Sequence, residues 1–314
     1  MRQRSRQTRQ QGAALLIALA LTAIAAVIAS DILDRGLWSS RQTLVNSRLN
    51  QARQLVLGLE DWGIKILDRD FQQSAPNYMD GLNDVWNRPL PPTEIPGGFI
   101  SGQLLEQSGR FNINSLVDSS GQADPLARQR FLRLLDILDL DRAVAEQLID
   151  WLDPDGIALP LGGEDAAYSG YGLARLPANS PMAHVSELRQ LPALDPVSYT
   201  LLSRHVYAAP AGNSAINVNT AGEEVLMALA EALDREIARR IIRSRGDGYN
   251  RLDEFLALPE SEDVLIDPRG LTVQSRDFLM LARLQLNDLD MRYESLLRRQ
   301  GNQYHVYFRR QTVL

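Results

Sequence analysis

Four acidic side chains lie close together in one short segment near the middle of this 314-residue chain. Asp153 and Asp155 belong to the run Trp-Leu-Asp-Pro-Asp-Gly, and Glu164 and Asp165 follow a pair of glycines. Carboxylate oxygens are the ligands that hard divalent cations prefer, and glycines let a loop turn tightly around an ion. The chain has no cysteine, and no histidine lies near this segment, so it lacks the softer ligands that zinc favours. These residues therefore predict a calcium site.

The spacing of the acidic residues partly matches the calcium-binding loop of an EF-hand. Asp153, Asp155, the carbonyl oxygen of Ile157 and Glu164 occupy the first, third, fifth and twelfth positions of such a loop. The sixth position, which is glycine in an EF-hand, is Ala158, so we do not identify the segment as one. Three further residues could supply ligands: Asp150, Asn179 and Glu187. The alternative interpretation is an acidic loop that is only solvated.

Other features of the composition argue against catalysis and against general binding of nucleic acids. His184, His205 and His305 are far apart, and none lies beside a serine in a recognisable nucleophile motif. A metal hydrolase built on the acidic loop would need a general base beyond the metal ligands, and the loop offers none. The net charge is −6, whereas nucleic-acid-binding proteins need a basic face that displaces counterions. We therefore expect neither an enzyme nor a general nucleic-acid-binding protein.

A single glycine joins a basic segment to an apolar segment at the amino terminus. Residues 1–11 carry four arginines and no acid, and residues 13–29 carry no charge. In a secretory signal the small residue at the cleavage point follows the apolar stretch, whereas here Gly12 precedes it. Cleavage between Gly12 and Ala13 would remove the basic leader and leave the apolar segment at the new amino terminus. The alternative is an uncleaved anchor whose arginines stay in the cytoplasm.

The apolar segment predicts a membrane-spanning helix that continues into water. Its uncharged stretch would span roughly 28 Å as a helix, which is enough for the hydrocarbon core of a membrane. The first proline of the chain is Pro76, and Leu44, Leu55 and Leu59 recur at helical spacing on one face. We therefore predict one helix over residues 13–75, with the leucine face as a candidate surface for partners.

Both ends of the region after this helix have the pattern of an antiparallel sheet. Five segments have the length and spacing of strands: Phe99–Glu106, Arg110–Asn114, Asp277–Leu286, Asp290–Leu297 and Gln303–Arg310. The first two flank a Gln-Ser-Gly turn and predict a hairpin, and the proline-rich stretch before them excludes a helix or an inner strand. Residues 76–114 and 270–314 would then form one sheet around a helical insertion at residues 115–269.

The insertion contains two diverged copies of a small helical unit. Phe-Asn-Ile-Asn-Ser at residues 111–115 corresponds to Ile-Asn-Val-Asn-Thr at residues 216–220, and residues 140–149 correspond to residues 233–242. The second copy resembles helix-hairpin-helix modules of competence-type DNA-binding proteins, which hold phosphate on the backbone amides of a Gly-x-Gly turn. Here that turn, Ala230–Asp234, has two acids and no glycine, so we expect no nucleic-acid binding. A membrane-anchored DNA-binding protein of this type remains the alternative function.

Taken together, these features resemble the family of general secretion pathway protein K, the large minor pseudopilins of type II secretion. The resemblance covers the whole chain, and it rests on the leader ending at Gly12, the long amino-terminal helix, the helical insertion, and the run Trp151–Gly156 followed by Gly-Gly-Glu-Asp and Tyr168. It implies an α+β pseudopilin fold, with the long helix packed on an antiparallel sheet and a large insertion similar to SAM or helix-hairpin-helix domains. It also implies calcium binding in that insertion.

The resemblance also implies a place in the secretion apparatus. Most pilins and pseudopilins have a glutamate five residues into the mature chain, where this chain has Ile17, and its absence is typical of protein K. In other subunits that carboxylate is thought to pair with the amino terminus of the subunit above, so a subunit without it can be uppermost. The implied protein is cleaved and methylated by prepilin peptidase and has one inner-membrane span and a periplasmic domain. With minor pseudopilins I and J, it would start a pseudopilus at the inner-membrane assembly platform.

Overall fold

The computed structural model describes residues 4–73, 78–164, 168, 177–210, 214–287 and 289–313. The chain divides into two compact units, Met1–Leu57 and Gly58–Leu314. The longest element is helix α1 (Arg4–Gln73), which has 70 residues. It begins before residue 13, where we predicted its start, because the arginines and glutamines of the amino-terminal segment are good helix formers.

The first unit contains the apolar part of α1. Within the part of the chain that the structure describes, α1 is the one helix long and apolar enough to cross a membrane. An 18-residue window of it has a mean hydropathy of 2.4, and none of that window is buried in the structure. Leu44, one of the three leucines proposed as a partner surface, is 59% exposed.

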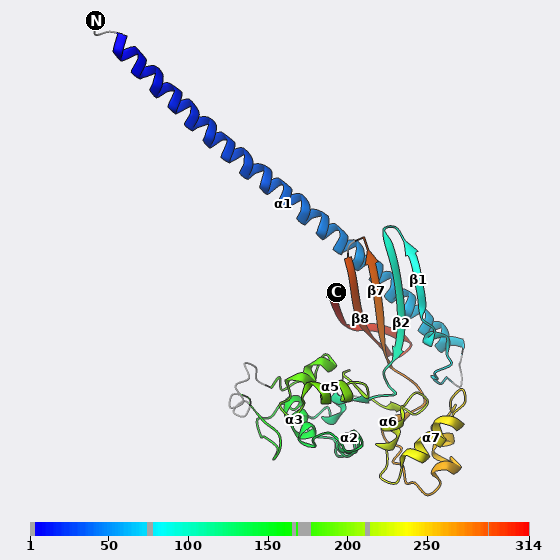
Figure 1. The fold of residues 1–314 in the computed structure, drawn as a ribbon. Coiled ribbons are helices and arrows are strands. Elements are labelled where there is room, and N and C mark those ends of the chain that lie inside the picture. Colours follow the sequence, from blue (N-terminus) through cyan, green and yellow to red (C-terminus); the bar gives the residue numbers. More distant parts are fainter. Residues whose placement is uncertain are drawn as a thin grey trace. The chain divides into compact units, whose positions relative to one another are not determined.

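The second unit contains a five-stranded antiparallel sheet, in which the strand order is β1-β2-β7-β8-β9 (Figure 1). Its strands are β1 (Leu90–Ile95), β2 (Gly98–Glu106), β7 (Asp277–Leu286), β8 (Leu289–Gln300) and β9 (Gln303–Val313). The three carboxyl-terminal strands are confirmed, and β7 has the predicted bounds. The structure is therefore the mixed α and β fold, with a long amino-terminal helix and an antiparallel sheet, that the sequence predicts.

The predicted hairpin of residues 99–106 with residues 110–114 is wrong. Strand β2 pairs instead with β1 on one side and with β7 on the other. The proline-containing strand β1 is tolerated because it lies at the edge of the sheet, and its register shifts between Leu90 and Thr93, where the two prolines stand. The two-residue strand β3 (Phe111–Asn112) pairs in parallel with β4 (Val206–Tyr207), outside the main sheet.

The last turns of α1 pack on the sheet through apolar side chains and small residues. Leu59 and Leu67 are 5% and 1% exposed. A Cβ added to Gly102 of β2 would lie 2.8 Å from Leu59, and one added to Gly63 would lie 3.5 Å from Leu104. The glycines therefore let the helix and the strand approach closely. Because Leu59 is part of this core, it is not available as a partner surface.

The region between β2 and β7 is mainly helical. Its helices are α2 (Pro125–Ile137), α3 (Ala143–Leu152), α5 (Pro196–Leu202), α6 (Glu223–Met227), α7 (Arg235–Ser244) and α8 (Leu252–Leu256), with 3-10 turns at Ile113–Leu116, Val185–Gln190 and Pro259–Ser261. A second short parallel pair joins β5 (Ile216–Asn217) to β6 (Leu271–Thr272). Fully buried aromatic side chains, Phe131 in α2 and Phe255 in α8, belong to a single apolar core that includes both Asn-x-Asn segments.

The two Asn-x-Asn segments make the same local contacts. Asn112 accepts a hydrogen bond from the Asn114 backbone N–H at 3.2 Å, and Asn217 accepts one from the Asn219 N–H at 2.9 Å. The second asparagine of each copy exchanges hydrogen bonds with the backbone of one distant residue, Met182 in the first copy and Tyr249 in the second. Each asparagine therefore ties the start of its helical unit to that unit's end.

Candidate functional site

Helix α3 leads directly into the first acidic residue of the candidate metal centre. Its apolar residues are buried, among them Leu148, Ile149 and Leu152, so the direction of the helix is fixed by the core. Asp153 follows the last turn in an extended conformation, and its N–H donates to the Ile149 carbonyl at 2.9 Å. The helix therefore ends by placing the Asp153 carboxylate at the base of the acidic loop.

Three of the predicted ligands are brought together. Asp153, Asp155 and Glu164 each offer a carboxylate oxygen, and these atoms lie within 4.8 Å of one another. Asp153 is 7% exposed, and its Oδ1 atom has no hydrogen-bond partner among the residues described. A buried carboxylate oxygen without a donor is costly, and a bound cation would satisfy it.

Two further acids hold the loop through its backbone. The fully buried Asp150 carboxylate accepts hydrogen bonds from the N–H groups of Leu159, at 3.0 Å, and Gly163, at 2.7 Å. Glu146, one turn earlier on α3, accepts from the Leu161 N–H at 2.8 Å. Asp150 was a possible further ligand in the sequence, and its carboxylate instead orders the loop. Glu146 was missed, although its spacing of four residues from Asp150 places both on one helix face.

Burial and like charges disfavour the ionised acids in this site when no cation is present. The pKa of Asp153 is raised to about 6, first by burial and then by the nearby charges of Asp155 and Asp150. Burial also raises the pKa of Asp150, whereas the hydrogen bonds from Leu159 and Gly163 lower it. A divalent cation would oppose these effects because it stabilises the ionised carboxylates.

The remaining predicted residues differ in how close they lie to this cluster. Ile157 is 76% exposed, and its N–H donates to Asp155 Oδ1 at 2.8 Å. The Asn179 amide lies 3.4 Å from the Asp155 carbonyl oxygen. Glu187 is not in the cluster, because its carboxylate accepts from the backbone of Ala183 and His184 and caps a 3-10 turn. Asp165 lies outside the described residues.

The donor set fits a hard cation. The cluster consists of carboxylate oxygens, and the Ile157 backbone N–H and the Asn179 side-chain amide both donate to Asp155 beside it. Calcium takes six to eight oxygen ligands in flexible geometry, whereas zinc prefers nitrogen and sulfur. The unpartnered Oδ1 of Asp153 is the observation that favours an ion over a solvated loop.

The histidines occupy separate structural positions. His184 caps the 3-10 turn at Val185–Gln190, and its ring stacks on Phe308 with 5.3 Å between centroids. The imidazole of His205 is half-buried 3.8 Å from Glu224, and burial lowers its pKa. His305 is exposed on β9.

The turn that corresponds to a helix-hairpin-helix phosphate site is occupied by an acid. It lies between α6 and α7, and the Asp234 carboxylate accepts a hydrogen bond from the Ile237 N–H at 2.8 Å. Glu231 is exposed in the same turn. A phosphate there would meet negative charge and would have to compete for an amide that already has an acceptor, so the structure disfavours DNA binding by this route.

A second group of carboxylates was missed in the sequence. Asp70 of α1, Asp80 and Asp84 offer oxygens within 4.8 Å of one another. Asp80 accepts hydrogen bonds from the Tyr78 hydroxyl and the Ser275 N–H, and Asp84 accepts from the Trp86 indole N–H at 3.1 Å. The bond from Ser275 to Asp80 joins residues far apart in the sequence, so the sequence offers only a local richness in aspartate as a signal.

Comparison with known proteins gives consistent matches over most of the chain. The family model described as type II secretion system (T2SS), protein K, matches in two parts, at residues 109–211 and 216–274. Type II secretion system protein K of Klebsiella pneumoniae is 30% identical over 316 residues, which cover 96% of each chain. The protein of the same name from Pseudomonas aeruginosa is 32% identical over 256 residues, which cover 78% of this chain and 76% of that relative.

A solved structure has the same fold. It is the crystal structure of the GspK-GspI-GspJ complex from the type 2 secretion system of enterotoxigenic Escherichia coli. The matching chain superposes with a TM-score of 0.76 at 25% sequence identity, and the match covers 86% of this chain and 99% of that one.

Proposed function

The chain belongs to the family of type II secretion system protein K, and we propose that it is the minor pseudopilin at the tip of a secretion pseudopilus. The observation that carries the proposal is the likeness, over 86% of this chain, to a protein solved in a GspK-GspI-GspJ complex. By this likeness its partners are minor pseudopilins I and J. The three subunits would start a fibre that grows from the inner-membrane assembly platform and serves protein export across the outer membrane.

The proposed anchoring follows from helix α1. Its uncharged stretch would cross the inner membrane once, and the arginines of residues 2–9 would keep the amino terminus in the cytoplasm. Prepilin peptidase would cleave between Gly12 and Ala13 and methylate the new amino terminus. The second unit would then lie in the periplasm. Ile17, at the position where most pseudopilins have a glutamate, supports an uppermost subunit because it needs no charged partner above it.

Affinity capture tests the assignment of partners. The full chain is co-expressed with minor pseudopilins I and J of its own secretion system and is purified in detergent through a tag on its carboxyl terminus. We expect the three proteins in equal amounts, and we expect no capture when the major pseudopilin of the same system replaces I and J. Capture of neither I nor J, from cells that produce both, would contradict the proposal.

We also propose that the acidic loop binds calcium and that the ion orders the loop against helix α3. Asp153, Asp155 and Glu164 would be ligands, with the Ile157 carbonyl and Asp165 as further candidates. The three close carboxylates and the buried, unpartnered oxygen of Asp153 support this proposal. Calcium here has a structural role, because binding to the folded form alone stabilises that form by mass action.

Thermal melting of the full chain in detergent micelles tests the calcium proposal. Free calcium at about 100 times its dissociation constant should add roughly 2.7 kcal/mol of stability relative to chelator. Asp155→Ala combined with Glu164→Ala should remove that gain. Glu262→Ala combined with Asp263→Ala is the matched control, because it also removes two acids, here from the exposed segment after α8, and should keep the gain. Identical melting of the unmutated chain in calcium and in chelator would leave a solvated loop.

A further inference from the structure

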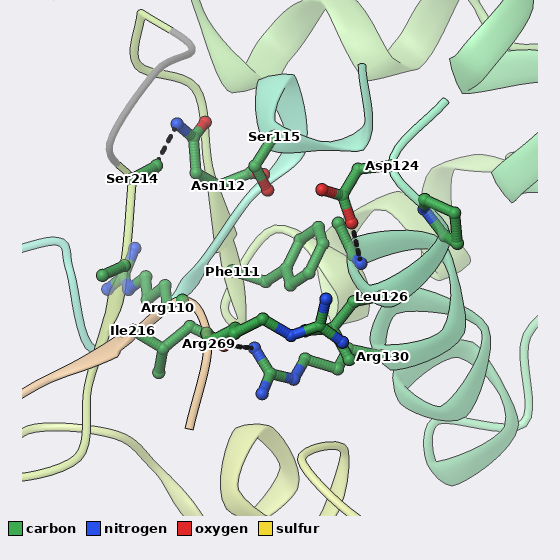
Figure 2. Close-up of a pocket in the computed structure, with 14 residues that line it drawn as sticks. Arg110, Phe111, Asn112, Ser115, Asp124, Leu126, Arg130, Ser214, Ile216 and Arg269 are labelled. Carbon is green, nitrogen blue, oxygen red and sulfur yellow. Dashed lines mark hydrogen bonds between the residues drawn. The ribbon is translucent and has the colours of Figure 1, made fainter. Parts of the chain in front are cut away.

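A pocket of about 250 Å³ lies at the start of helix α2, away from the acidic loop (Figure 2). Three arginines line it: Arg110 before β3, Arg130 of α2 and Arg269 before β6. The acidic residue among its lining side chains is Asp124, which precedes α2. The lining therefore has an excess of positive charge in a chain that is acidic as a whole.

Arg130 is a buried cation that contacts only neutral acceptors. It is 3% exposed, and its two terminal nitrogens donate to the backbone carbonyls of Arg269, at 2.8 Å, and Asp267, at 2.7 Å. Its Nε atom is buried and has no hydrogen-bond partner within the described part of the chain. Burial lowers the pKa of this guanidinium, and the nearby Asp267 carboxylate raises it. One donor of a buried charged group thus lacks an acceptor, which an anion in the pocket could supply.

Arg110 is a second cation without an ion pair. Among the residues described, no carboxylate lies within salt-bridge distance of its guanidinium, although the charge of Glu106 raises its pKa against the larger, lowering effect of burial. The Glu106 carboxylate is already engaged, because it accepts hydrogen bonds from the Gly109 N–H at 3.0 Å and from the Ser275 hydroxyl at 2.7 Å. Arg110 is therefore free of an ion pair with the described residues and can bind an anion.

The other charged groups at the pocket neutralise each other or are occupied. Arg269 is exposed and forms a two-bonded ion pair with Asp267, at 2.6 Å for the closest contact. Asp124 accepts a hydrogen bond from the Ala127 N–H at 2.7 Å and so caps α2. Arg110 and Arg130 are consequently the two cations of the lining that form no ion pair with a described carboxylate.

Size and apolar lining restrict the kind of anion. The volume is below the roughly 300–1,000 Å³ of pockets that hold small-molecule ligands, so it suits a single side chain or chain end. The ring of Phe111 borders the pocket beside the arginines (Figure 2) and stacks on Phe131 with 5.2 Å between centroids. An anionic group on a short apolar stem would match both features. Guanidinium groups bind planar carboxylates through two parallel hydrogen bonds.

We propose that this pocket binds a carboxylate of another protein, either an acidic side chain or a carboxyl terminus, through Arg110 and Arg130. The proposal concerns a site separate from the metal centre and does not depend on the position of the chain in a fibre. Two sources of the carboxylate share this chemistry, and model compounds distinguish them. N-acetylglutamate amide presents a side-chain carboxylate, whereas N-acetylalanine presents a terminal one.

Saturation-transfer NMR on the full chain in detergent micelles tests the site at constant ionic strength. At least one of the two compounds should receive saturation from the protein, and its neutral amide counterpart, N-acetylglutamine amide or N-acetylalanine amide, should not. The compound with the stronger response identifies the source. Equal responses from the charged and neutral members of both pairs would overturn the proposal, as would displacement of the compound by inorganic phosphate at lower concentration than by acetate.

Substitutions of the two arginines test whether the carboxylate compound binds in this pocket. Arg110→Gln should weaken binding of the responding compound roughly tenfold or more, because it removes a charged donor. Arg243→Gln, on exposed α7, is the matched control and should bind as the unmutated chain does. Arg130→Lys should weaken binding while keeping the buried positive charge, and its melting temperature shows whether it is folded. Unchanged binding by Arg110→Gln would overturn the assignment.

Discussion

Glu60 of helix α1 and Arg309 of strand β9 form a two-bonded ion pair between the helix and the sheet. Arg309 Nη2 lies 2.7 Å from Glu60 Oε2, and its Nε lies 2.8 Å from Oε1. The Ser295 hydroxyl also donates to Oε1. The side chain of Glu60 is 2% exposed and that of Arg309 is 51% exposed. Only the carboxylate is desolvated, so the two partners depend on the pair unequally.

Arg309→Met should therefore destabilise the chain more than Glu60→Gln. Loss of the arginine leaves a buried carboxylate with one hydroxyl donor, at a cost of about 3–5 kcal/mol. Loss of the glutamate charge leaves an arginine that can turn to water, and glutamine can still accept from Ser295, so we expect about 1 kcal/mol. Urea unfolding of the full chain in micelles, followed by tryptophan fluorescence, measures both. Equal losses of unfolding free energy in the two variants would mean that Glu60 and Arg309 depend on the ion pair to the same extent.

The buried aspartates near Trp86 should make stability depend on pH. Burial and the Asp84 charge raise the pKa of Asp70 to about 6, and burial raises that of Asp80 to about 7, against hydrogen bonds from Ser275 and Tyr78 that lower it. The unfolded value is about 3.9. Between these values the folded chain binds more protons than the unfolded chain, so the unfolding free energy should increase as pH falls from about 8 to 5.

Asp70→Asn isolates one part of this effect. The variant should flatten the pH dependence by about 1–2 kcal/mol, a value reduced from the full pKa difference because Asp70 is only partly buried. The difference between the two unfolding curves, measured in chelator at each pH, removes the contribution of the acidic loop. Asp263→Asn, at an exposed position, should leave the curve unchanged. A stability that falls on acidification from pH 8 to 6 would contradict the burial of these acids.

Substitution by alanine should affect one glycine of the acidic loop and leave the other unaffected. A Cβ on Gly162 would overlap the Asp150 carboxylate, which holds the loop, whereas a Cβ on Gly156 meets nothing within 4 Å. Gly162→Ala should therefore lower the thermal stability and reduce the gain from calcium, and Gly156→Ala should do neither. Melting curves with calcium and with chelator compare the two variants. Equal behaviour would mean that Asp150 does not order the loop.

The helices and strands that could be predicted are those that depend on residues close together in the sequence. The apolar residues after Gly12 and the absence of proline before Pro76 were enough for α1, and the length and spacing of the segments were enough for β7 and β9. The hairpin prediction failed because Phe111–Asn112 pairs with Val206–Tyr207, which is far away in the sequence. Local turn signals cannot reveal that pairing, since a short strand has no preference of its own between partners.

In the candidate site, too, the sequence predicted the residues that lie close together in the chain and missed those whose role depends on the fold. Asp153, Asp155 and Glu164 lie within one loop, so their spacing predicted their proximity. Glu187 was a candidate by residue type, but it caps a turn instead. Arg110 and Arg130 gave no signal, because lone arginines in a chain with 33 basic residues are ordinary. Their significance comes from burial and missing partners, which only the fold determines.

Gly12→Val should block processing of the amino terminus. Gly12 and Ala13 lie within α1, and the proposed cleavage between them requires a small residue that a peptidase can accommodate. Intact mass of the membrane-extracted protein should show a chain that begins at Ala13 in the parent and an uncleaved chain in the variant. Gly36→Val, at a glycine with open space around it on the same helix, is the control and should be cleaved. A parent chain that retains Met1 or begins near Ser30 would contradict the proposed leader.

Ile17→Glu should leave the second unit folded and impair the proposed role at the tip. Ile17 lies in the apolar part of α1 and is 61% exposed in the structure. A glutamate there would enter the membrane without a partner from a subunit above, at a cost of roughly 2–4 kcal/mol. Ile17→Leu is the control, because it keeps the apolar character. Secretion and the number of pseudopili are measured in strains that carry only one variant. Full secretion with Ile17→Glu would mean that the missing carboxylate does not mark the uppermost subunit.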